Sequence, residues 1–155
     1  MNNTRFSYGN AARYIHALNA ILLIITWASH DLEGEGQLFF ILHIVTGLAA
    51  LGFTILQLIW HYAAKSPDPL PDLSAFRKAA IHWNHILIMF TALAGGVTGV
   101  ILWQLDNLEG LHDLSSNVLI VLFLMHVAGV LFYQFTKGNT LARMGLNPFN
   151  RSFKE

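Results

Sequence analysis

Apolar residues dominate four segments of the chain, and polar loops containing glycine or proline separate them. The segments cover about residues 12–30, 38–62, 77–105 and 113–136. Each is close to or above the roughly 20 residues that an α-helix needs to cross the hydrocarbon layer of a membrane. The pattern predicts an all-α fold, a four-helix transmembrane bundle, and we expect the whole chain, residues 1–155, to form one domain.

The first segment is the shortest, and Arg5 and Arg13 precede it, as basic residues precede a signal peptide. No small-x-small cleavage site follows it, however, and it contains His16, which a cleaved apolar segment would not need. We therefore interpret it as a membrane helix.

Composition supports a membrane protein, because 54% of the residues are hydrophobic and only 12% are charged. Soluble domains usually have about a quarter of their residues charged. The formal net charge is zero, so no overall attraction to nucleic acid is expected. The chain has no cysteine, which excludes disulfides, iron–sulfur clusters, thiolate zinc sites and c-type haem attachment.

Charged residues are sorted between the two sides of the predicted bundle. All basic residues fall on one side, whereas the two opposite loops carry only acidic ones. By the positive-inside rule, both termini and the middle loop are expected to be cytoplasmic. The basic residues are Arg5, Arg13, Lys65, Arg77, Lys78, Lys137, Arg143, Arg151 and Lys154, and the acidic residues opposite are Asp31, Glu33, Glu35, Asp106, Glu109 and Asp113.

Histidines are the candidate functional residues, since polar side chains inside a membrane are costly and usually mark function. His112 and His126 are separated by almost four helical turns, so they project from one face of the fourth helix, about 21 Å apart along its axis. His112 should lie near the outer surface and His126 deeper, toward the inner side.

Each of these histidines has a candidate partner at matching depth. The first helix starts inside and carries His16 near its start, and the second starts outside and carries His43 near its start. We predict the pairs His16/His126 and His43/His112. Imidazole is a common axial ligand of haem iron, and bundles build cofactor sites from facing helices. The pairs therefore predict two haems b, with these four histidines as the iron ligands.

Small residues lie beside the four predicted ligands, as a flat macrocycle against a helix would require. They follow each histidine by one turn of helix and are Ala20, Gly47, Ser116 and Gly129. Gly95, Gly96 and Gly99 in the third segment either allow a haem to approach closely or serve plain helix–helix packing. Asn19, Trp27, Trp103 and Asn117 are candidates to support the ligands.

The remaining histidines have less definite roles. His30 is expected in a solvated loop, and His61 is expected at the membrane interface beside Trp60 and Tyr62. His82 and His85 share one helix face near the inner surface and are candidates, with Arg13, for contacts to a haem propionate or a quinone. Proton transfer and structural hydrogen bonding remain open for His82 and His85.

The chain resembles the bacterial di-haem cytochrome b561 family, whose members include a superoxide oxidase, over nearly its whole length. The matching stretches are Tyr14-Ile15-His16, Leu42-His43-Ile44-Val45-Thr46-Gly47, Ala80-Ile81-His82-Trp83-Asn84-His85, Leu111-His112-Asp113, Met125-His126-Val127-Ala128 and Asn139-Thr140-Leu141-Ala142-Arg143-Met144. The resemblance implies a multi-pass protein of the bacterial inner membrane whose axial histidines are His16, His43, His112 and His126. It also implies electron exchange with quinone.

Two departures from the family affect what can be carried over. Gln57 and His61 stand where relatives often have an arginine, and Tyr133 and Gln134 stand where they often have paired histidines. The outer loops are short and acidic, which would repel the superoxide anion and would suit a basic electron-transfer protein of the periplasm better.

The expected function is electron transfer across the bilayer, between a quinone and an outer-side donor or acceptor. Oxidation of superoxide coupled to ubiquinone is one alternative, and a haem-carrying anchor subunit of a larger respiratory complex is another. A histidine-lined transporter for protons or metal ions is a third, although the lack of acidic residues inside the membrane argues against it. Expected partners are membrane lipid and quinone, with no nucleic acid, and no residue is assigned a catalytic role.

Overall fold

The computed structural model describes residues 8–30, 32–64, 73–102, 108–137 and 140–144. Within these ranges the chain is helical and contains no strand. The elements are α1 (Asn10–His30), the short 3-10 helix η1 (Glu33–Glu35), α2 (Gln37–Ala63), α3 (Ala75–Leu102), α4 (Glu109–Lys137) and α5 (Thr140–Arg143). Helices α1, α2, α3 and α4 are long and apolar enough to span a membrane, which confirms the predicted fold class.

The helices extend beyond most of the apolar segments that predicted them. Helix α3 begins at Ala75, and the predicted end of this helix at residue 105 lies outside the described residues. Helix α4 begins at Glu109, before the predicted start at residue 113. Its first turn carries the Glu109 carboxylate, which the positive end of the helix dipole favours. Hydropathy therefore marked the apolar part of this helix, while its polar first turn continues the same hydrogen-bonded ladder.

Polar and apolar side chains are distributed as in a protein that lipid surrounds. Large apolar side chains face outward along all four long helices, and Phe76 and Phe135 are both 82% exposed. Several of the most buried side chains are polar instead: Asn19, Ser29, Thr46, Thr54 and Gln134. This arrangement is expected where the surroundings are hydrocarbon and polar groups must find partners inside the bundle.

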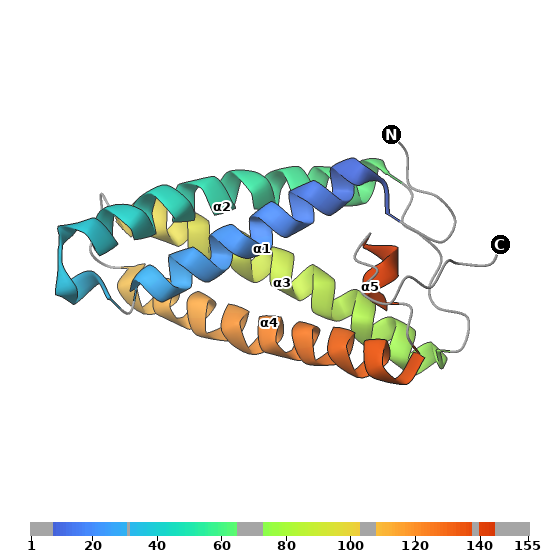
Figure 1. Cartoon of the computed structure of the whole chain (residues 1–155). Helices are drawn as coiled ribbons and strands as arrows, with labels where there is room; N and C mark the ends of the chain where they lie inside the picture. The colour runs from blue at the N-terminus through green and yellow to red at the C-terminus, as the bar shows by residue number, and fades with distance from the viewer. Residues whose placement is uncertain (1–7, 31, 65–72, 103–107, 138–139, 145–155) are drawn as a thin grey trace.

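The long helices form two antiparallel pairs (Figure 1). Helix α1 packs along α2, α3 packs along α4, and contacts between α2 and α3 join the pairs. The start of α1, the end of α2, the start of α3 and the end of α4 lie at one end of the bundle, together with α5. We call this the inner end, and we call the end with η1 the outer end.

Hydrogen bonds between polar side chains fix the register of α1 against α2. Near the outer end, Thr26 Oγ1 donates to Thr46 Oγ1 at 2.9 Å. Toward the inner end, Asn19 Nδ2 lies 3.2 Å from Thr54 Oγ1 and 3.0 Å from Gln57 Oε1. Sliding one helix along the other would break all of these bonds together. The shift would be unfavourable, because an unpaired polar group in hydrocarbon is costly.

The glycines of α3 permit close packing. A Cβ atom on Gly96 would lie 2.8 Å from Leu51 Cδ1 of α2, which is closer than van der Waals contact allows. Gly96 thus serves the helix–helix packing that was one of the two interpretations of the glycine group.

Candidate functional site

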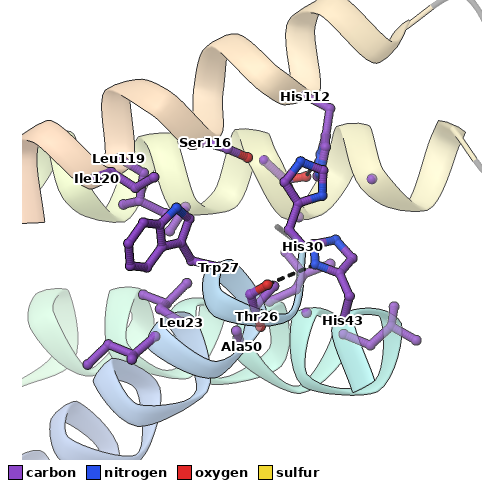
Figure 2. A pocket seen from close by; sticks show the side chains of 18 of the residues that line it. Leu23, Thr26, Trp27, His30, His43, Ala50, His112, Ser116, Leu119 and Ile120 are labelled. Carbon is purple, nitrogen blue, oxygen red and sulfur yellow. Dashed lines mark hydrogen bonds between the residues drawn. The ribbon is translucent and has the colours of Figure 1, made fainter. Parts of the chain in front are cut away.

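The imidazole rings of His43 and His112 face each other across the bundle near its outer end. Helix α2 supplies His43 and helix α4 supplies His112, and the ring centres are 6.1 Å apart with their planes inclined by 85°. Figure 2 shows both rings, with His30 of α1, gathered at one end of a cavity. The structure therefore brings together the outer pair that helix depth predicted.

Backbone carbonyls orient both rings of this pair. His43 Nδ1 lies 2.9 Å from the carbonyl oxygen of Thr26, and His112 Nδ1 lies 3.0 Å from that of Gly95. A carbonyl oxygen only accepts hydrogen bonds, so each ring must donate its Nδ1–H. The lone pair of each neutral imidazole is then on Nε2, which is the usual preparation of a histidine that ligates a metal.

A cavity of about 370 Å³ adjoins the outer pair and is lined by all four long helices. This volume lies within the range of about 300–1,000 Å³ typical of sites for small molecules and cofactors. Gly47 and Ser116, two of the small residues expected beside a ligand, line it, and so does Trp27. A Cβ atom on Gly99 would lie 3.0 Å from His112 Cε1, so a larger residue there would displace the imidazole.

The inner pair has the same spacing. His16 of α1 and His126 of α4 have ring centres 6.1 Å apart, with an interplanar angle of 69°. A smaller cavity of about 50 Å³ is lined by both histidines and by Ala20. His16 Nδ1 faces a side chain and not a backbone carbonyl, since Gln57 Nε2 lies 3.4 Å away.

The spacing of the two pairs suits ligation of one metal ion by two imidazoles. A bond from a metal to an imidazole nitrogen is about 2 Å long. With the ring radius added on each side, two rings on opposite sides of one ion have centres roughly 6 Å apart. Both pairs match this value, and along α4 the two sites are separated by about 21 Å.

His85 does not fit this role opposite His126. Its ring centre is only 4.7 Å from that of His126, which leaves too little room for an ion between the rings. Its Nδ1 donates to the carbonyl oxygen of Ile81 at 2.8 Å, so the ring is held against its own helix beside the inner pair. The His82 side chain lies elsewhere. It is exposed, and its ring centre is 6.3 Å from that of His61 of α2.

His30 corrects one expectation. It was expected in a solvated loop, but it is the last residue of α1 and lines the larger cavity. Its ring centre lies 5.2 Å from that of His43 and 6.4 Å from that of His112. Helix α1 ends at His30, where the predicted segment also ends, so the last helical turn carries this histidine to the cavity.

Arg13 is the arginine of α1. It precedes His16 by one helical turn, and its Nε atom is buried without a hydrogen-bond partner in the described part of the chain. Guanidinium groups often pair with a carboxylate or phosphate.

A comparison with family models identifies the family of the chain. A model described as prokaryotic cytochrome b561 matches residues 7–146. The chain belongs to the prokaryotic cytochrome b561 family. No curated protein matches it closely enough to count as a relative.

Membership of the cytochrome b561 family gives the cavities a chemical meaning. The family implies a multi-pass membrane protein that binds haem b and transfers electrons across the membrane. The donor set agrees, since paired imidazoles next to a mainly apolar cavity suit haem iron. The sequence did not reveal the carbonyls of Thr26 and Gly95, because backbone acceptors carry no sequence signal. Trp103, a candidate supporting residue, lies outside the described residues.

Proposed function

We propose that this cytochrome b561 family member holds two haems b in one domain, residues 1–155, and passes electrons between them across the membrane. His43 and His112 would ligate the outer iron, and His16 and His126 the inner iron. The observation that carries the proposal is the presence of two imidazole pairs, each with ring centres 6.1 Å apart, at two depths of the bundle.

Three features of the chain support binding of the macrocycle. The Nδ1–H groups of His43 and His112 are engaged by backbone carbonyls, which places the lone pair of a neutral ring on Nε2. Gly99 leaves room for the His112 ring. Arg13 offers a buried Nε–H that a haem propionate would satisfy. When bound, haem supplies one-electron chemistry, and the protein influences it through ligands, hydrogen bonds and local dielectric.

We propose that quinone reacts at the inner end. His82 is exposed on α3, so a lipid-soluble molecule could reach it from the membrane. An imidazole N–H can donate a hydrogen bond to a quinone carbonyl, and the uptake of protons by a reduced quinone requires such groups. His85, on the same helix, has its ring against that of His126 of the inner pair.

At the outer end, the exposed carboxylates favour a cationic protein partner over superoxide. Glu35, Glu109 and Asp113 are all exposed there. A negative rim lowers the local concentration of an anion and raises that of a basic protein. The proposed outer partner is therefore a basic electron-transfer protein of the periplasm. The orientation with cytoplasmic termini in a bacterial inner membrane completes this proposal and rests on the charge distribution of the loops.

A haem count on the purified protein tests the proposal. The pyridine haemochrome assay should give two haems b per chain, and quinol should reduce both in the visible spectrum. A ratio of one haem per chain would show that only one of the two proposed sites binds haem. A protein without haem would refute the proposal. Reduction of the haems by superoxide at a rate above that with quinol would instead favour a superoxide oxidase.

A further inference from the structure

The two pairs differ in the group that orients one of their histidines. The comparison is between His16 of α1 in the inner pair and His43 of α2 in the outer pair. His43 is held by the backbone carbonyl of Thr26, which no substitution can remove. His16 is held by the amide of Gln57, at 3.4 Å from Nδ1. Side chains can be replaced, so a substitution at position 57 can change what holds His16.

A chain of hydrogen bonds extends from this contact into the α1–α2 interface. Gln57 Oε1 lies 3.0 Å from Asn19 Nδ2, and Asn19 in turn contacts Thr54 Oγ1 through Nδ2 at 3.2 Å and through Oδ1 at 3.4 Å. Asn19 is 5% exposed and Thr54 is 1% exposed. Each polar atom at this depth therefore depends on its neighbour, and the network acts as a unit.

The direction of this network decides which nitrogen of His16 can bind iron. With Gln57 Nε2 facing His16, the amide donates and Nδ1 accepts, so the ring proton is on Nε2 and blocks coordination there. A side-chain amide can turn by 180° with almost no change of shape, which exchanges its oxygen and nitrogen. If Gln57 and Asn19 turn together, Gln57 Nε2 donates to Asn19 Oδ1 and Thr54 Oγ1 donates to the same oxygen. His16 Nδ1–H then donates to Gln57 Oε1, and Nε2 is free.

We infer that Gln57 is a positioning residue for His16, with its oxygen toward the ring when the inner haem is bound, and that it sets the potential of that haem. This inference rests on the proposed function. A stronger acceptor at Nδ1 makes the imidazole a better electron donor to iron and stabilises the oxidised state. A carboxylate at position 57 should therefore lower the inner potential, and an apolar side chain should raise it.

The experiment compares Gln57→Glu and Gln57→Met with the unmodified protein by spectroelectrochemistry. The midpoint potential that disappears in a His126→Ala variant is assigned to the inner haem. The midpoint potential of the inner haem should be lowest in Gln57→Glu, intermediate in the unmodified protein and highest in Gln57→Met. The potential of the outer haem should stay unchanged. Thr46→Val is the matched control, because Thr46 also is a buried hydroxyl of the α1–α2 interface but lies near the outer end.

The outcomes separate this inference from the proposed function. Shifts of opposite sign for the two variants, confined to the inner haem, support the role of Gln57, because a merely structural defect would not change sign with the acceptor. Shifts of the same sign, no shift, or a shift of the outer haem would overturn it while two haems remain bound. Absence of haem from the unmodified protein would instead refute the proposed function itself.

Discussion

His43 and His112 approach each other from opposite halves of the bundle, with ring centres 6.1 Å apart and ring planes nearly perpendicular. Each ring is anchored through Nδ1 to a backbone carbonyl, so the orientation of the pair depends on how the helices pack. Displacing α1 or α3 would move the anchors, Thr26 and Gly95, and would therefore alter this site.

Replacement of one α4 histidine should remove one haem selectively. We expect His112→Ala to lose the outer haem and His126→Ala to lose the inner one, because each site loses one of two axial ligands and the sites are about 21 Å apart. The measurement is the haem-to-protein ratio, which should fall from two to one in each variant, together with the visible spectrum.

His82→Ala is the matched control for these two variants, since His82 is an exposed histidine of α3. It should keep both haems. Retention of both haems by either α4 variant would show that its histidine is not a ligand.

Gly99→Ala should weaken the outer site without affecting the inner one. The new methyl group would lie 3.0 Å from His112 Cε1 and 3.3 Å from Nδ1, so the ring must move. Overpacking of this kind costs about 1–3 kcal/mol, which corresponds to roughly a tenfold or greater loss of haem affinity. Haem release to an apo-globin acceptor measures this loss. Gly52→Ala should behave as the unmodified protein, since a Cβ atom there meets nothing within 4 Å, and equal effects of both changes would refute the steric argument.

Arg13→Gln should lower the midpoint potential of the inner haem. The guanidinium is one turn from His16, and its positive charge disfavours the additional positive charge of oxidised iron. Removal of a charge at this range changes the free energy by on the order of 1 kcal/mol, or tens of millivolts for one electron. Redox titration of both haems measures the shift. Arg77→Gln serves as the control because Arg77 is exposed on α3 at the same end, and an equal shift there would attribute the effect to general surface charge.

Thr54→Val should destabilise the fold by about 1 kcal/mol, since it removes the hydroxyl that satisfies Asn19. Thermal unfolding in detergent, followed by circular dichroism, provides the measurement. Thr91→Val should lower the stability of the fold by a smaller amount, because the Thr91 hydroxyl donates to the carbonyls of Leu87 and Ile88 in its own helix. A larger loss for Thr91→Val would show that the α1–α2 network contributes little to stability.

The hydropathy pattern by itself determined the four helices, and helix direction then determined the depth of each histidine. Both are local properties, since apolar length sets a membrane span and the rise per residue sets depth. They were sufficient to propose His16 with His126 and His43 with His112, whose rings the structure brings together. Their role as axial ligands remains a prediction.

Only the tertiary structure decided what surrounds these rings. Sequence spacing made His82 and His85 equivalent on one helix face, yet His85 lies against His126 and His82 lies near His61 of another helix. The anchoring of His43 and the network around Gln57 depend on how α1 is rotated and shifted against α2. Such contacts join residues far apart in the chain, and the energy that selects them comes from side-chain packing and hydrogen bonding between helices, which periodicity within one helix does not record.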